Sequence, residues 1–171
     1  MLSWSVLALA VLTATTSTGL AGIRYNAPPP DFAIPAPHGP QYLDGLRGRV
    51  VVVDFWATWC DACTAEMKDF VRAKRSFGDR LAVLTVSSEP HDIAASYFRL
   101  WNIALPVVED PSGAISRAYG VSKVPVTLVL DPQGNVSYVS VGGLSWEELN
   151  GAIEQAAAAL APSTPTPRVL Q

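Results

Sequence analysis

Cys60 and Cys63 are the only cysteines in this chain of 171 residues, and just two residues separate them. Three kinds of chemistry use such a pair: a structural disulfide, half of a metal site, and a redox-active dithiol. A disulfide between residues this close constrains the unfolded chain very little, so it would stabilise the fold only weakly. A structural zinc needs two further ligands, and only His38 and His91 are available, without a second close ligand pair. These alternatives stay open, but the dithiol is favoured.

The neighbourhood of Cys60 predicts a reactive thiol. The apolar run Val50–Trp56 before it is typical of a strand buried on both faces. After it, apolar residues recur at helical spacing, at Met67, Phe70, Val71 and Phe77. Cys60 therefore falls at or near a helix N-cap, where free N–H groups and the helix dipole stabilise an anion such as a thiolate. Only the thiolate attacks a disulfide, and Cys63, one turn further along the same face, is placed to resolve a mixed disulfide.

The rest of the chain supplies elements that could hold this pair. A short hairpin is expected from Phe32–Ile34 and Gln41–Leu43. Further strands are expected at Leu81–Val86, Pro106–Val108, Val126–Leu130 and Val136–Val141. Helices are expected at His91–Trp101, at Ser112–Tyr119, and from a cap at Ser145 to about Leu160. This order predicts an α/β fold with a central mixed β-sheet flanked by helices, extended by the N-terminal hairpin.

The two ends of the chain differ in composition from its middle. Residues 1–23 carry no charged side chain and contain the apolar run Val6–Leu12, which predicts a signal peptide or an N-terminal membrane anchor. Residues 24–30 are expected to form a Pro-rich linker and residues 161–171 a disordered tail, which leaves the folded domain at 31–160. Either interpretation of the N-terminus exports the domain to an oxidising environment, where disulfides persist.

The overall composition excludes several other functions. The chain is 49% hydrophobic and 16% charged with a net charge of −3, which suits a globular domain and gives no sign of binding nucleic acid. It has no glycine-rich phosphate loop and no nicotinamide or flavin motif. We therefore expect a monomer without a cofactor or resident metal, reduced by an external donor.

The segment Phe55-Trp56-Ala57-Thr58-Trp59-Cys60-x-x-Cys63 resembles the active-site segment of the thioredoxin superfamily. The fuller pattern is similar to exported thiol:disulfide oxidoreductases of the TlpA/ResA/DsbE type. Its other pieces are Asp31-Phe32, Leu46-Arg47-Gly48, Glu66-Met67, Tyr119-Gly120-Val121 and Val124–Asp131. The resemblance covers roughly 31–160. It implies a periplasmic or extracytoplasmic protein that reduces cysteines of other exported proteins, notably apocytochrome c before haem attachment, with electrons from a membrane carrier.

The resemblance also implies roles for single residues. Cys60 would be the attacking thiol and Cys63 the buried resolving thiol. Pro125 matches the cis-proline of the family, beside which the backbone at Val124 would receive the chain of the partner. Trp59 is expected at the rim of the site, whereas Trp56 is expected in the core.

Asp54 is the most informative polar residue, because it interrupts an otherwise apolar strand. A carboxylate buried without a partner costs several kcal/mol or becomes protonated. By resemblance it is the buried acid that moves protons to and from the resolving cysteine; an edge-facing or hydrated aspartate is the alternative. The lysine that thioredoxin places nearby is absent from Leu81–Ser87. Glu66 could be a second acid, although a position on the helix surface is at least as strongly expected.

Two departures from the family pattern concern the first helix. Asp61 and Ala62 stand between the cysteines, and we hypothesise that the Asp61 carboxylate competes for the positive helix end and raises the pKa of Cys60. Lys68 stands where thioredoxin has a proline that kinks the helix, so a straighter helix is expected.

Two other functions stay open as alternatives. The first is a peroxiredoxin-like peroxidase, whose Pro-x-x-x-Thr-x-x-Cys setting is absent here. The second is a copper chaperone that binds metal through both thiolates. The Sco-type chaperones have three residues between the cysteines and add a histidine, which this sequence does not match. His38 and His91 are expected to be solvated, without a catalytic role.

Overall fold

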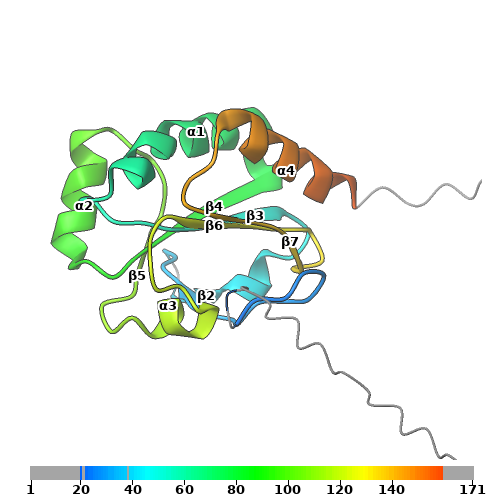
Figure 1. The fold of residues 1–171 in the computed structure, drawn as a ribbon, viewed down its shortest axis with the longest axis horizontal. Helices are drawn as coiled ribbons and strands as arrows, with labels where there is room; N and C mark the ends of the chain where they lie inside the picture. Colours follow the sequence, from blue (N-terminus) through cyan, green and yellow to red (C-terminus); the bar gives the residue numbers. More distant parts are fainter. Residues whose placement is uncertain (1–19, 21, 38, 160–171) are drawn as a thin grey trace, which may run out of the picture.

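The computed structural model describes residues 20, 22–37 and 39–159. Its centre is a five-stranded mixed sheet in the order β5-β4-β3-β6-β7, with helices on both faces (Figure 1). The strands of this sheet are β3 (Val50–Phe55), β4 (Leu81–Ser87), β5 (Val107–Glu109), β6 (Val126–Leu130) and β7 (Val136–Val141). Strands β3, β4 and β5 are parallel, whereas β6 is antiparallel to β3 and β7 is antiparallel to β6. The expected fold class is confirmed.

The helices divide between the two faces of the sheet. They are α1 (Asp61–Phe77), α2 (His91–Leu100), α3 (Ala114–Tyr119) and α4 (Trp146–Ala158), with short 3-10 turns η1 (Leu43–Leu46) and η2 (Gly78–Arg80). One core lies between the sheet and α1, α2 and α4, and a second lies between the sheet, α3 and the N-terminal segment (Figure 1). Each face of the sheet is therefore covered, which explains why its central strands are mostly apolar, with Asp54, Thr85 and Thr127 among the few buried polar residues.

The expected N-terminal hairpin is present but shorter than predicted. It pairs β1 (Ala33–Ile34) with β2 (Gln41–Tyr42) in antiparallel register. Leu43, which was expected in the second strand, begins η1 instead, and its N–H donates to the carbonyl of Phe32 at 3.0 Å. Leu43 and Leu46 are both buried in the second core. Residues three apart lie on the same side of a 3-10 turn, so η1 directs both leucines into this core.

Strand β3 positions the site because its side chains alternate between the two cores. Val50 and Val52 face the core under α1, whereas Val51, Val53 and Phe55 face the core on the α3 side. By the same alternation Asp54 lies on the face of the sheet that α1 covers. The strand ends at Phe55, and Trp56, predicted as its last residue, begins the loop that leads to Cys60.

The Pro-rich segment before residue 31 contacts the folded domain. The N–H of Asn26 donates to the carbonyl of Val136 at 2.9 Å, and the N–H of Val136 donates to the carbonyl of Ala27 at 3.0 Å. The hydroxyl of Tyr119 donates to the carbonyl of Pro30 at 2.7 Å. Tyr119 is completely buried, and this burial raises the pKa of its phenol. The segment thus lies beside the start of β7 and over the second core.

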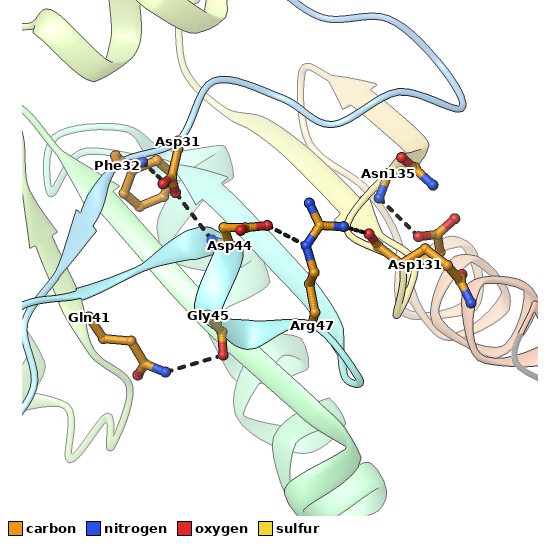
Figure 2. A network of polar contacts seen from close by, with 9 residues as sticks. Asp31, Phe32, Gln41, Asp44, Gly45, Arg47, Asp131 and Asn135 are labelled. Carbon is orange, nitrogen blue, oxygen red and sulfur yellow. Dashed lines mark hydrogen bonds and ion pairs between the residues drawn. The ribbon is translucent and has the colours of Figure 1, made fainter.

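A polar network around Asp31, Asp44 and Arg47 also attaches the N-terminal segment to the domain (Figure 2). The Asp31 carboxylate accepts from the N–H groups of Phe32 and Asp44 at 3.0 and 3.1 Å. Arg47 then pairs with Asp44 and donates to the carbonyl of Gln133 in the turn between β6 and β7. The network joins the N-terminal segment, η1 and the β6–β7 turn.

Other predictions for the ends of the chain fall outside the described residues. These are most of the expected signal or anchor, His38, the tail 161–171, and Leu160, which was expected near the end of the last helix. Among residues 20, 22–37 and 39–159, no helix has the length and apolar character needed to cross a membrane.

Candidate functional site

Cys60 and Cys63 form a disulfide at the N-terminus of α1. Their Cα atoms are 5.3 Å apart and the S–S distance is 2.10 Å. Cys60 is the N-cap residue, as the sequence predicted, and its Sγ accepts a hydrogen bond from the N–H of Cys63 at 3.2 Å. Cys60 is 8% exposed and Cys63 is completely buried. Of the two sulfurs, that of Cys60 is therefore the one that a partner can approach.

A tight turn between β3 and α1 carries Cys60. The N–H of Cys60 donates to the carbonyl of Ala57 at 3.2 Å, which closes the turn. Trp56 is buried and stacks on Phe98 of α2 with ring centroids 4.9 Å apart. Trp59, in contrast, is 72% exposed. Trp56 therefore lies in the core, as expected, and Trp59 is exposed next to Cys60, so its place at the rim of a binding site stays a prediction.

The carboxylate of Glu89 holds this turn from the loop between β4 and α2. It accepts the N–H of Thr58 at 2.7 Å with one oxygen and the Thr58 hydroxyl at 2.7 Å with the other. The two loops are neighbours because β3 and β4 are parallel, so their carboxyl ends lie at the same edge of the sheet. Glu89 was not among the residues expected from the sequence to belong to the site.

The peptide bond between Val124 and Pro125 is cis, and Pro125 directly precedes β6. Gly143, in the loop after β7, lies close to Pro125 and to two residues of α1, Glu66 and Ala62. A Cβ atom at Gly143 would lie 3.7 Å from Glu66 Oε2, 3.8 Å from Pro125 Cγ and 3.9 Å from Ala62 Cβ. The N–H of Gly142 donates to the carbonyl of Pro125 at 3.0 Å, which ties the two loops together.

Asp54 is completely buried in the sheet beneath α1. The Thr127 hydroxyl on β6 donates to its Oδ1 at 3.0 Å, and on the other side Asp54 pairs in register with Thr85 of β4. Burial raises the pKa of Asp54 well above its ordinary value, the nearby charge of Glu66 raises it further, and the Thr127 hydrogen bond opposes this. The edge-facing alternative is therefore wrong.

Glu66 is also buried, which corrects the expectation of a helix-surface residue. Its side chain is 4% exposed, and Oε2 accepts the N–H of Leu144 at 3.1 Å. Burial raises its pKa from 4.5 to about 7, the Leu144 hydrogen bond opposes the rise, and the charge of Asp69 adds to it. Glu66 lies three residues after Cys63 and four before Phe70, so it falls on the buried face that they share. This spacing along the helix is the feature of the sequence that could have predicted the burial of Glu66.

Asp54 and Glu66 are thus two buried acids close enough for their charges to interact, where thioredoxin has an acid and a lysine. Within the described part of the chain, Asp54 Oδ2 and Glu66 Oε1 have no hydrogen-bond partner. A buried carboxyl in this state favours its protonated form, because only the neutral acid avoids the full desolvation cost. Glu66, whose pKa burial raises to about 7, can therefore hold a proton near neutral pH.

A groove of about 460 Å³ opens beside Glu66. It runs between the start of α1 and the loop that precedes α4, and is lined by residues that include Ala62, Glu66, Gly143 and Leu144. It passes next to Pro125, as the contacts of Gly143 show.

The remaining expected residues lie at the surface. Asp61 is the first residue of α1 and is exposed, so its expected effect on the pKa of Cys60 stays a prediction. Helix α1 is continuous through Lys68. His91 begins α2 and contacts Glu109, with Nδ1 and Oε1 2.6 Å apart. Among the described residues, no group of three Cys, His, Asp or Glu side chains is placed to hold a metal ion.

Solved structures of thiol–disulfide proteins share this architecture. One, described as a DsbE-type thiol:disulfide interchange protein from Chlorobium tepidum, is 28% identical with a TM-score of 0.71 and covers 78% of this chain and 98% of its own. The exposed lipoprotein thioredoxin of Streptococcus pneumoniae is 27% identical with a TM-score of 0.61, covering 74% and 99%. The fold and the Cys60–Cys63 pair, taken with these likenesses, define a thioredoxin-like thiol–disulfide oxidoreductase.

Family and sequence relatives agree with this class. The chain matches the model of the AhpC/TSA family over residues 26–139 and belongs to that family. It is 28% identical over 145 residues to the thioredoxin-like protein YneN of Bacillus subtilis, covering 82% of this chain and 85% of that one. It is 27% identical over 130 residues to the thiol-disulfide oxidoreductase ResA of the same organism, covering 74% and 73%.

Proposed function

We propose that this oxidoreductase reduces disulfides in exported proteins through a two-step cycle at Cys60 and Cys63. The thiolate of Cys60 attacks one sulfur of a partner disulfide, forms a mixed disulfide and releases the first partner thiolate. The thiolate of Cys63 then attacks Cys60 Sγ, releases the second partner thiolate and leaves the Cys60–Cys63 disulfide. Two electrons pass to the partner, and the two released thiolates take up protons.

The placement of the two sulfurs supports this division of labour. Cys60 is the more exposed, and its Sγ accepts the Cys63 N–H at the positive end of α1, an environment that favours a thiolate. Cys63 is buried, so an external disulfide does not reach it, whereas a mixed disulfide on Cys60 does. This asymmetry is the observation that carries the proposal.

The acids would manage the proton of the resolving thiol. A buried thiolate at Cys63 is costly, so Cys63 must lose its proton only as it attacks and regain one when the disulfide is reduced. Asp54 and Glu66 are buried carboxyls with raised pKa values on the same side of the sheet as α1. We assign them the role of accepting and returning that proton.

The partner would bind across the rim of the site. Trp59 offers an exposed aromatic face, and the chain at Val124 and Pro125 adjoins the groove beside Glu66. A cysteine-bearing segment in extended conformation suits this surface. Apocytochrome c is the substrate class that the family resemblance suggests, with a membrane carrier as electron donor and the periplasm or extracytoplasmic face as the location.

The reduction potential of the Cys60–Cys63 pair tests the direction of the cycle. The protein is equilibrated in graded thiol buffers and its free thiols are counted. A potential near that of thioredoxin, about −270 mV, supports a reductase. A potential near that of DsbA, about −120 mV, would instead make the protein an oxidant that forms disulfides in its partners. A pair that does not cycle in any buffer would end the proposal.

A further inference from the structure

We propose that Glu89 is a positioning residue for Cys60, acting through Thr58. The inference rests on the proposed role of Cys60 as the attacking thiol. Both oxygens of the Glu89 carboxylate are engaged by one residue, since they accept the N–H and the hydroxyl of Thr58 at 2.7 Å each. Hydrogen bonds to an ionised acceptor are stronger than those between neutral groups. Thr58 stands two residues before Cys60, inside the turn that ends at the N-cap.

The turn has few other restraints of its own. The N–H of Trp56 donates to the carbonyl of Val86 at 3.0 Å before the turn, and Cys60 closes it by a longer bond of 3.2 Å to Ala57. Between these points the exposed side chain of Trp59 makes no restraining hydrogen bond among the described residues. The Glu89 contacts are the shortest that hold this segment, so they fix how Trp59 and Cys60 are presented.

Glu89 is also held in place by contacts other than those with Thr58. Its N–H donates to the hydroxyl of Ser87 at 3.2 Å, and that hydroxyl lies 3.5 Å from Glu89 Oε2. Ser87 is buried at the end of β4, and Pro90 follows as the N-cap of α2. The residue before a proline is restricted to extended conformations, which limits the freedom of Glu89 further. The carboxylate is therefore a fixed acceptor rather than a mobile surface group.

Glu89 affects the stability of the Cys60 thiolate in two opposite ways. The hold on Thr58 keeps Cys60 Sγ at the N-cap, where it receives the Cys63 N–H, and this favours the thiolate. The negative charge of Glu89 near the turn disfavours the thiolate. A single substitution that removes both effects would confuse them, so the test compares two variants of equal charge.

Glu89→Gln removes the charge but retains both contacts. Its carbonyl can accept the Thr58 N–H, and its amide can donate to the Thr58 hydroxyl. Glu89→Ala removes the charge and both contacts. The difference between the two variants therefore measures positioning alone. Glu109→Ala is the matched control, because the Glu109 carboxylate contacts His91 at the start of α2 and, among the described residues, makes no hydrogen bond to Thr58 or Cys60.

The readout is the reaction of the reduced protein with 5,5′-dithiobis(2-nitrobenzoate) and with iodoacetamide, followed against pH, with the modified cysteine identified by mass spectrometry. We expect Glu89→Ala to react with the disulfide reagent about tenfold more slowly than Glu89→Gln, since misplacement of a reacting atom has effects of this size or larger. The Cys60 pKa should also be higher in Glu89→Ala than in Glu89→Gln. Glu109→Ala should match the unmodified protein.

Equal rates and equal Cys60 pKa values in the two Glu89 variants would overturn the inference. If Glu89→Ala does not fold, Thr58→Val decides, because it removes only the hydroxyl contact. A rate reduced about two- to fivefold supports positioning, and an unchanged rate refutes it. These thiol measurements stand even if the unmodified protein reduces no protein disulfide, so failure of the proposed function is seen separately from failure of this inference.

Discussion

Replacing Glu66 with glutamine should change the pH dependence of folding stability in a defined direction. Glu66 lies under α1 with its side chain 4% exposed, and its pKa is raised from 4.5 to about 7 mainly by burial. The folded state therefore binds a proton at Glu66 more tightly than the unfolded state does. Stability is fullest below pH 4.5, where both states are protonated, and is lost as pH rises through about 7.

The size of this loss follows from the shift in pKa. A rise from 4.5 to about 7 corresponds to at most about 3.4 kcal/mol of charging cost. Glu66 lines an open groove rather than a closed interior, so solvent screens part of this cost. We therefore expect a loss of about 1–2 kcal/mol between pH 4.5 and pH 8. Glutamine does not ionise, so Glu66→Gln should remove this loss.

Urea unfolding of the oxidised protein at pH 4.5, 5.5, 6.5 and 8 measures the effect. The quantity to compare is the slope of the unfolding free energy with pH, because a glutamine amide near Asp54 also adds an offset that does not depend on pH. The control is Glu154→Gln, an exposed carboxylate on α4 that accepts only from Asn150. Parallel pH profiles for Glu66→Gln and the unmodified protein would refute the argument that Glu66 is a buried proton-binding group.

Three further predictions concern the helix ends at and near the site. Cys63→Ala should accumulate a mixed disulfide through Cys60 with its substrates, seen on non-reducing gels; no trapped species with a reducible partner would contradict the assigned order of attack. Asp61→Asn should lower the pKa of the Cys60 thiol, measured by alkylation against pH, and an unchanged or higher value would refute the proposed competition for the helix end. Ser145→Ala breaks the capping box with Glu148 and should cost about 1 kcal/mol in urea unfolding, whereas a cost near zero would show that the cap is dispensable.

The position of Cys60 could be predicted because it depends on local patterns alone. A largely apolar strand followed by apolar residues at helical spacing leaves little freedom for where the helix begins. The burial of Asp54 was favoured for a related reason: both neighbours of a charged residue inside such a strand are apolar, although an edge-facing or hydrated position stayed open as the alternative. Both predictions use only the periodicity of single elements, and the structure places both residues as expected.

Glu66 and the Pro-rich segment were harder to predict because other elements decide their burial. Glu66 shares a helix face with Cys63 and Met67, but whether that face is covered at its edge depends on the loop at Leu144. Likewise, the stretch before Asp31 has no apolar periodicity. It is held by backbone hydrogen bonds to Val136 and by the hydroxyl of Tyr119, contacts about 90 to 110 residues distant in sequence.

The register of the sheet explains why these separate features meet in one site. Phe55, the last residue of β3, pairs with Val86 near the end of β4 and with Val126 at the start of β6. Whatever follows β3, follows β4 and precedes β6 must therefore gather at one edge of the sheet. Those segments are the turn to Cys60, the loop that carries Glu89, and the cis bond at Pro125. A mixed sheet is needed for this, because a parallel β6 would place Pro125 at the opposite edge.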